Sequence, residues 1–137
     1  ACPVNGPRVS ALGNQVAVAW YTGAKDNPEV KVSFSDDNGN SFETPTKIDL
    51  GQTLGRVDIE MIAQDKAMVC WMEEGKILVR SVDSSGKLGN PIQVATSSDK
   101  RSSGFPQMTK NGNTLWFAWT DDSGDLKKVK VAKMTDI

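Results

Sequence analysis

The sequence predicts an all-β fold made of β-propeller blades, and three observations predict it. A unit of about 49 residues occurs three times, opened by Gly6, Gly55 and Gly104. Each copy contains an apolar segment that ends in tryptophan: QVAVAW to Trp20, KAMVCW to Trp71 and NTLWFAW to Trp119. Gly, Asn, Pro and Asp residues separate the short apolar segments, as turns do. A repeat of this length with four strands per copy is typical of propeller blades.

The strands of each copy follow from the alternation of apolar segments and turn residues. The first copy is expected to hold strands at 8–12, 15–22, 29–35 and 45–50, and the second at 57–63, 66–73, 76–83 and 90–95. The third is expected to hold strands at 105–110, 113–120 and 127–134. The tripeptide VKV at 30–32 recurs at 129–131, which is two periods further along. The predicted fold is therefore three antiparallel meanders, the last without its outer strand.

The repeats organise residues 1–137 as a single partial propeller domain, with blades at approximately 6–54, 55–103 and 104–137. A propeller usually closes when the N-terminal strand completes the last blade, which hides both open sheet edges. The missing outer strand therefore predicts half of a roughly six-bladed propeller whose N-terminal half is absent from this sequence. The rival prediction is that two copies form the ring, with residues 2–4 of one copy pairing with the open edge of the other.

Composition excludes several classes of protein. The net charge is −1, with 16 Lys and Arg against 17 Asp and Glu, so no basic face is expected for nucleic acid. No apolar run approaches the roughly 20 residues that cross a bilayer, and the N-terminus does not resemble a signal peptide. The sequence has no histidine, which excludes Ser/His/Asp and Cys/His catalysis and imidazole metal sites within it. No metal and no cofactor are expected.

The two cysteines indicate little about function. Cys70 precedes Trp71 in a strand whose other copies have Ala19 and Ala118 at that position, so it is expected to be a small buried residue. Cys2 lies in the terminal stretch ACPVN. It could be a free thiol, the partner of Cys70 or of a cysteine outside this sequence, or the remnant of a lipid-modified site.

The sharpest local motif is SDDNGNSF, in which the defined positions are Ser35, Asp37, Gly39, Ser41 and Phe42. It lies at the turn between the third and fourth strands. There Asp37 can accept hydrogen bonds from turn amides, Gly39 can take a positive φ, and Phe42 has an apolar side to bury between blades. Degraded copies follow, with Ser81, Asp83, Gly86 and Leu88 in the second repeat and Asp136 in the third.

This motif resembles the Asp-box of the sialidase-like, or BNR-repeat, propellers, and the resemblance covers nearly the whole chain. It implies the C-terminal half of a bacterial exo-alpha-sialidase-like protein. In that family Asp-boxes are structural and lie opposite the ligand face, so the ligand side would hold the loops that join fourth to first strands and second to third strands. The binding candidates on that side are Arg8, Arg56, Asp58, Glu60, Arg101 and Gln107, and further polar side chains there are Tyr21, Glu73, Glu74, Asp121 and Asp122.

The resemblance to sialidases does not carry catalysis onto these residues. Sialidases hold a carboxylate with three arginines, whereas here Arg8 and Arg56 open their blades and Gln107 stands at the position of Arg8. Tyr21 is the only tyrosine, and the residues around it do not match the family's nucleophile motif.

The predicted function is therefore a non-catalytic propeller domain that binds a glycan or another extracellular partner, located outside the cell or in the periplasm as the family resemblance implies. One alternative is a glycoside hydrolase of the sialidase type that is active only with its other half. The other is a protein-interaction scaffold.

Overall fold

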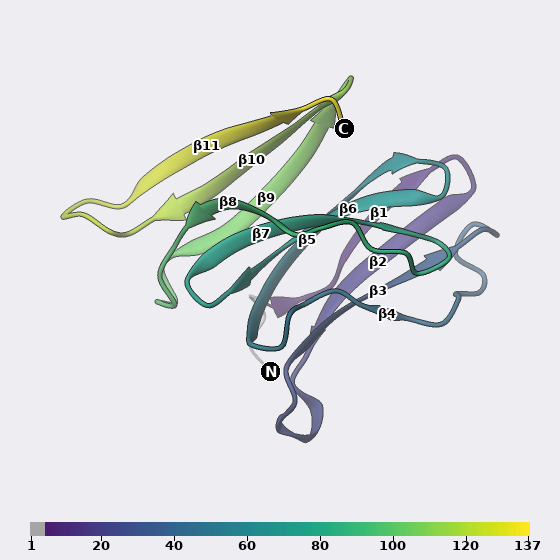
Figure 1. Ribbon diagram of the computed structural model, residues 1–137, viewed down its shortest axis with the longest axis horizontal. Helices are drawn as coiled ribbons and strands as arrows, with labels where there is room; N and C mark the ends of the chain where they lie inside the picture. The colour runs from purple at the N-terminus through teal and green to yellow at the C-terminus, as the bar shows by residue number, and fades with distance from the viewer. Residues whose placement is uncertain (1–4) are drawn as a thin grey trace.

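The computed structural model describes residues 5–137 and contains three antiparallel sheets in chain order (Figure 1). The first sheet holds β1 (Arg8–Leu12), β2 (Gln15–Thr22), β3 (Glu29–Ser35) and β4 (Thr46–Lys47), with the short 3-10 turn η2 (Ala24–Asp26) before β3. The second holds β5 (Thr53–Ala63), β6 (Lys66–Glu73), β7 (Lys76–Asp83) and β8 (Ile92–Thr96). The third holds β9 (Gly104–Asn111), β10 (Thr114–Asp121) and β11 (Lys128–Thr135). Each sheet is a meander in which neighbours in sequence pair in space, so the predicted blade fold is confirmed.

Strands β8 to β11 differ from the predicted ranges by one or two residues at their ends, and two other strands differ by more, each for a local reason. The fourth strand of the first blade, expected at 45–50, is only Thr46–Lys47. Beyond it the Asp49 carboxylate accepts from the Val30 amide at 2.8 Å, so a side chain replaces the next backbone partner. The first strand of the second blade begins at Thr53 instead of 57, because pairing with β6 continues across a bulge at Gly55.

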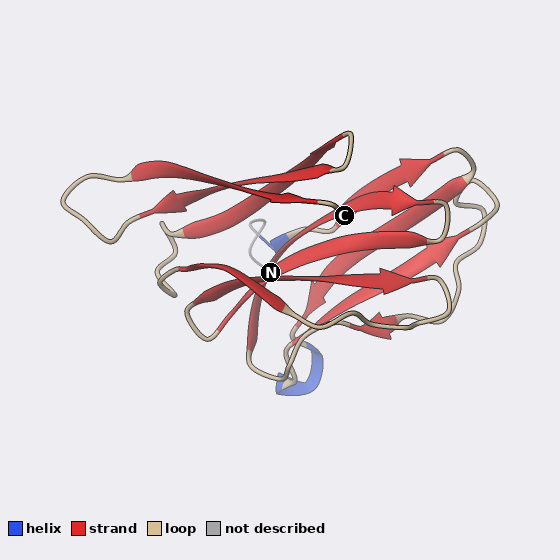
Figure 2. Cartoon of the chain, turned by 45° about the horizontal axis from the view of Figure 1, so that its top comes forward, coloured by secondary structure: helices blue, strands red, loops and turns tan. Residues whose placement is uncertain are grey.

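The sheets stack face to face, with the inner strands β1, β5 and β9 side by side and the outer strands splayed apart (Figures 1 and 2). One apolar core lies between blades 1 and 2 and contains Val32, Phe34, Val57, Ile59 and Trp71. The other lies between blades 2 and 3 and contains Met72, Val79, Met108, Leu115 and Phe117. Blade 2 is therefore buried on both faces, which is why β6 is buried at every residue after Lys66.

The three repeated tryptophans each face the preceding blade. Trp71 is fully buried against blade 1, and Trp119 is 8% exposed against blade 2. Trp20 occupies the same position in blade 1, where no earlier blade is present among residues 5–137, and it is only half-buried. The repeated tryptophan is therefore buried in the two blades that have a preceding blade among residues 5–137.

The two outer faces of the stack carry exposed apolar side chains. On blade 1, Val9 is 66% exposed and Phe42 is 46% exposed, and Phe42 lines a shallow hollow with Val18 and Trp20. The expectation that Phe42 is buried between blades is therefore wrong within the described residues, because no blade covers that face. On blade 3, Trp116, Val129 and Val131 are exposed on the face turned away from blade 2.

Two glycines make the close approach between neighbouring blades possible. Gly55 and Gly104 both have φ +79, and a Cβ on Gly104 would lie 2.2 Å from Met72 Sδ. A Cβ on Gly55 would lie 2.6 Å from the Tyr21 ring. Tyr21 and Met72 each follow the repeated tryptophan, so the residue at the end of a second strand packs onto the glycine that opens the next blade. This contact repeats the period seen in the sequence.

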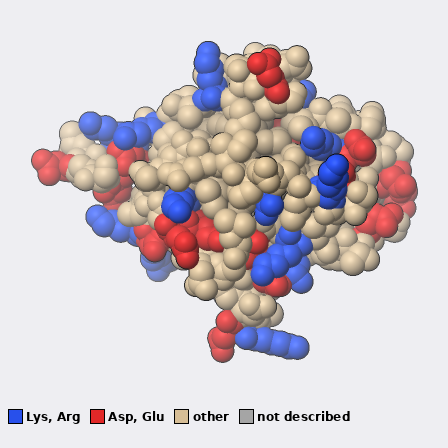
Figure 3. Space-filling view, viewed as in Figure 1, with Lys and Arg blue, Asp and Glu red and all other residues tan. Residues whose placement is uncertain are grey.

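Lys and Arg side chains are interspersed with Asp and Glu over the face shown in Figure 3, which agrees with a net charge of −1. Within residues 5–137, no helix has the length and apolar character needed to cross a membrane.

Candidate functional site

Three predicted binding residues occupy equivalent positions on the three inner strands. Arg8 pairs with Ala19, Asp58 with Cys70, and Gln107 with Ala118, and these partners match one another in the repeat. The register therefore makes Asp58, and not Arg56, the blade 2 counterpart of Arg8. Arg56 is instead the counterpart of Phe105, because each follows a glycine and has φ 55.

Asp58 joins the inner strands of blades 2 and 3. Its Oδ2 accepts from the Met108 amide at 2.7 Å, and its Oδ1 accepts from the Ile59 amide at 2.9 Å. Burial raises the pKa of Asp58, and these hydrogen bonds and the nearby charge of Arg8 only partly oppose that rise. Asp58 is thus a carboxylate held rigidly at the point where three inner strands converge.

Glu60 lies two residues further along β5, on the same face of the strand as Asp58. Burial and then the negative charge of Asp58 raise the pKa of Glu60, while the charge of Lys110 on β9 opposes the rise. Arg8, Asp58, Glu60 and Lys110 together form what we call the inner-strand cluster. It contains two carboxylates and two cations, contributed by β1, β5 and β9.

Arg56 is placed between blades. Its guanidinium Nη1 donates to the Ser103 carbonyl at 2.8 Å and to the Lys100 carbonyl at 3.1 Å, and it lies 4.4 Å from the centre of the Phe105 ring. The side chain is 8% exposed. Arg56 therefore anchors the connection between β8 and β9, and direct contact with a ligand stays a prediction for this residue.

The remaining predicted residues divide between surface and structural positions. Arg101 is exposed on the β8–β9 connection, and Gln107 is exposed on the outer face of blade 3. Glu73 is buried and accepts from Trp71 Nε1 and from the Leu50 amide, each at 3.0 Å, which gives it a structural role. Glu74 is exposed after β6, and Asp122 accepts from the Ser102 hydroxyl.

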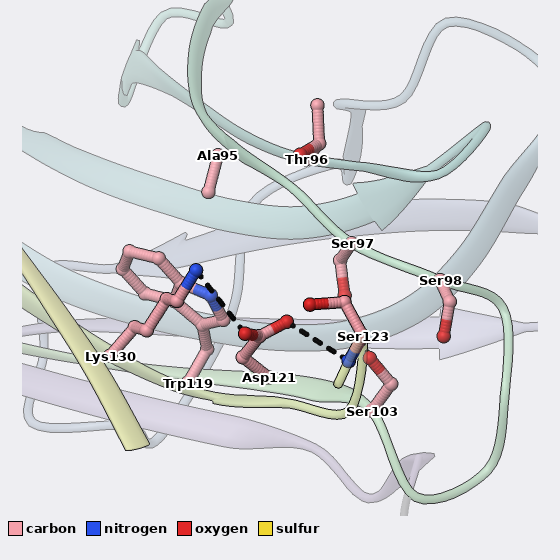
Figure 4. A pocket seen from close by; sticks show the side chains of 9 residues that line it. All are labelled: Ala95, Thr96, Ser97, Ser98, Ser103, Trp119, Asp121, Ser123 and Lys130. Atoms are coloured by element: carbon pink, nitrogen blue, oxygen red, sulfur yellow. Dashed lines mark hydrogen bonds and ion pairs between the residues drawn. The ribbon is translucent and has the colours of Figure 1, made fainter. Parts of the chain in front are cut away.

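The structure also contains a pocket of about 450 Å³ between blades 2 and 3 (Figure 4). We call it the inter-blade pocket. It lies at the end of the sheets where the β8–β9 and β10–β11 connections meet. Its lining comes from β8, both connections, β10 and β11, and consists of Ala95, Thr96, Ser97, Ser98, Ser103, Trp119, Asp121, Ser123 and Lys130.

Polar groups in this pocket are already paired with one another. Asp121 Oδ2 lies 3.2 Å from Lys130 Nζ, and Asp121 Oδ1 accepts from the Ser123 amide at 3.3 Å (Figure 4). Hydrogen bonding by Ser123 and then by Lys130 lowers the pKa of Asp121, so this side chain is a carboxylate at neutral pH. The hydroxyls of Ser97 and Ser103 lie 3.1 Å apart within the β8–β9 connection.

Sequence reasoning named Asp121 but missed the pocket around it. None of the other side chains that line it is among the predicted binding residues. Lys110, the fourth member of the inner-strand cluster, was also missed. The period of the repeat predicts which residues occupy equivalent positions in the blades. It does not predict which side chains of one blade contact those of the next.

The turn at SDDNGNSF has the hydrogen bonds that its residue types predict. Asp37 Oδ1 accepts from the Ser41 amide at 2.9 Å and from the Ser35 hydroxyl at 2.7 Å, and its Oδ2 accepts from the Ser41 hydroxyl at 2.5 Å. These bonds, with the Ser41 hydroxyl first, lower the pKa of Asp37 to about 2. Gly39 has φ +83. In the degraded copy, Asp83 accepts from the Ser85 and Lys87 amides, each at 3.0 Å.

Cys70 is a buried free thiol whose pKa burial raises. Cys2 and the segment 2–4 lie outside the described residues. Among residues 5–137, no three His, Cys, Asp or Glu side chains are placed to hold a metal ion.

Comparison with known proteins supports the fold. No protein-family model and no curated protein matches the sequence. Among solved structures, the GH43 protein BlXynB from Bacillus licheniformis superposes with a TM-score of 0.61 at 12% identity over 96% of this chain. A mutant of that protein gives 0.60 at 13% identity over 94%, and the Hadza microbial sialidase Hz136 gives 0.51 at 14% identity over 93%. This chain spans only 27%, 27% and 31% of those structures, in the order BlXynB, its mutant and the sialidase. At these identities the comparison establishes what the chain is structurally: a set of β-propeller blades of the kind found in glycoside-hydrolase structures.

Proposed function

We propose that this chain is a non-catalytic part of a sialidase-like propeller and that it binds a glycan through the inner-strand cluster. The observation that carries the proposal is the convergence of Arg8, Asp58, Glu60 and Lys110 from three inner strands, with burial raising the pKa of both carboxyl groups. Clustered groups with perturbed pKa values are more frequent at functional sites than elsewhere. The solved structures with similar blades include a sialidase, and the hydrogen-bonded Asp-box at Asp37 supports the same family.

The mixed charge of the cluster suits a hydroxyl-rich ligand. Carboxylates accept from sugar hydroxyls, while Arg8 and Lys110 donate to ring and hydroxyl oxygens. Because the two cations offset the two carboxylates, the cluster has no strong preference for an anion or a cation. A neutral or weakly acidic glycan therefore fits better than a phosphate or a polyamine.

A glycan array with neutral and sialic-acid-terminated glycans tests this proposal. The parent chain should retain a subset of glycans, and Glu60→Gln and Arg8→Met should each weaken the retained interaction by at least about tenfold, the loss of one charge-assisted hydrogen bond. Asp65→Asn is the matched control, because Asp65 lies in the turn after β5 at the far end of that strand. Retention that is absent from the parent, or equal in all variants, would refute the proposal and favour the protein-interaction scaffold.

A sialidase-type hydrolase that needs further blades is the second candidate. Burial raises the pKa of Asp58 and of Glu60, which favours this candidate because a general acid works better with a raised carboxyl pKa. Against it, the single tyrosine packs against Gly55 between blades. A fluorogenic sialoside separates the two candidates when it is given to this chain assembled with the further blades, since turnover there that Glu60→Gln abolishes would establish the hydrolase.

We further propose that other blades cover the two exposed apolar faces, supplied either by the rest of a longer protein or by a second copy of this chain. The supporting observation is that Val9 and Phe42 on blade 1, and Val129 and Val131 on blade 3, are exposed to solvent. The residues at equivalent positions of the other blades pack between blades. We also propose an extracellular or periplasmic location, because the sequence resembles the sialidase-like propellers.

A further inference from the structure

We propose that the inter-blade pocket is a second binding site, which takes one ring of a neutral sugar. It goes beyond the function proposed above, because its lining shares no residue with the inner-strand cluster. A volume of about 450 Å³ lies within the roughly 300–1,000 Å³ of small-molecule sites.

Contacts within the chain hold the walls of the pocket in place without a ligand. Arg56 holds the β8–β9 connection through the carbonyls of Lys100 and Ser103, and the Ser97 amide donates to the Gly75 carbonyl at 2.7 Å. The Ser102 hydroxyl donates to Asp122, which ties this connection to the one that follows β10. A connection fixed from three sides loses little conformational freedom on binding, so its polar groups are preorganised.

The lining selects for a neutral polyol. Asp121 and Lys130 face the same space and neutralise each other at 3.2 Å, so neither an anion nor a cation gains a net charge partner. Each still has capacity for another hydrogen bond, because a carboxylate accepts several and an ammonium donates three. The hydroxyls of Ser97, Ser98 and Ser103 add groups that both donate and accept.

An apolar wall completes the match. Trp119 and Ala95 lie on the side of the pocket away from the serine hydroxyls (Figure 4). A sugar ring has apolar C–H faces and a polar rim of hydroxyls, so it can place a face toward Trp119 while its rim reaches Asp121 and Lys130.

Amide-resolved NMR titration of the full chain with D-glucose, D-galactose and N-acetyl-D-glucosamine tests the inference. At least one sugar should shift the amides of residues 97–103 and 121–123. Asp121→Asn should weaken that interaction by at least about tenfold. The matched control is Asp125→Asn, on the β10–β11 connection that follows Asp121 but outside the pocket lining. Ser98→Trp should fill the pocket without changing the ion pair, with Asp99→Trp as its control.

Two results would overturn the inference. One is that none of the three sugars shifts these amides, and the other is that the folded Ser98→Trp chain binds as the parent does. Glu60→Gln distinguishes this inference from the proposed function. If Glu60→Gln abolishes the shifts while Ser98→Trp leaves them, the sugar binds the inner-strand cluster, so the proposed function stands and the pocket inference fails.

Discussion

Replacing Arg56 by methionine should destabilise the chain and loosen the connection that forms the pocket. Methionine keeps much of the length of the side chain and its apolar stem, so the change removes mainly the guanidinium. That group donates from Nη1 to the Ser103 carbonyl at 2.8 Å and to the Lys100 carbonyl at 3.1 Å, and it lies 4.4 Å from the Phe105 ring centre. Each of these contacts links blade 2 to the start of blade 3.

The size of the effect follows from the type of contact. A hydrogen bond from a charged donor contributes about 1.5–3 kcal/mol, and a cation–π contact about 0.5–2 kcal/mol. The contributions are not additive, because one nitrogen makes both hydrogen bonds. We therefore expect Arg56→Met to lower the free energy of unfolding by about 2–4 kcal/mol. Lys100→Met, at an exposed position of the same connection, should change it by about 0.5 kcal/mol or less, because Arg56 contacts the Lys100 carbonyl, which this substitution keeps.

Urea unfolding followed by tryptophan fluorescence measures both variants, since Trp71 and Trp119 are buried in the two inter-blade cores. With a slope of about 2 kcal/mol per molar urea, the Arg56→Met midpoint should fall by about 1–2 M. Amide exchange in residues 97–103 should also accelerate. Equal midpoints for Arg56→Met and Lys100→Met would refute the anchoring role.

Three further predictions concern pH, glycine geometry and assembly. Because burial raises the pKa of Asp58 in the folded chain, its stabilising contribution is present below the ordinary carboxyl pKa of about 3.9 and is lost as the pH rises through the raised value. Asp58→Asn should therefore lose less stability than the parent as the pH rises above about 4, measured by urea midpoints. Gly104→Ala should destabilise the chain by more than the roughly 1–2 kcal/mol of a left-handed residue alone, because the added Cβ would meet Met72 Sδ. Gly112→Ala supplies the control, with a similar positive φ and open space around it. Native mass spectrometry should find the 14.8 kDa chain bound to a second copy or to another polypeptide, because the outer faces of blades 1 and 3 are apolar.

Each of these predictions has a contradicting result. The same dependence of stability on pH in Asp58→Asn and in the parent would show that Asp58 keeps its ordinary pKa. Equal losses for the two glycine variants would mean that Met72 moves aside freely. A chain that stays monomeric at every concentration would show that the apolar outer faces are stable without a partner.

The sequence was sufficient for the elements within each blade. Strands β1, β2, β3, β6 and β7 have the predicted ranges, because alternation and turn residues act over a few neighbouring positions. The hydrogen-bonded SDDNGNSF turn was predictable for the same reason, since Asp37 and its partners lie within six residues of one another. Its aromatic residue was not, because the burial of Phe42 depends on a blade that the described residues do not contain.

The candidate site was predicted only in part. Arg8, Asp58 and Glu60 were chosen because they lie on first strands, and the structure places them together. Arg56 was chosen by the same reasoning, yet a bulge after Gly55 turns it toward blade 3. The inter-blade pocket was not predicted, because Ser97, Trp119 and Lys130 come from separate strands and connections.

By itself the sequence determined the repeat, the four-stranded plan of its units and the turns between strands, because these depend on local patterns that recur every 49 residues. Tertiary structure decided which side chains of different blades meet: Asp58 with the Met108 amide, Arg56 with the β8–β9 connection, and Trp119 with the pocket. The physical reason is that packing between sheets depends on bulges, register and the close approach at Gly55 and Gly104. The 49-residue period of the repeat predicts none of these features of packing between blades.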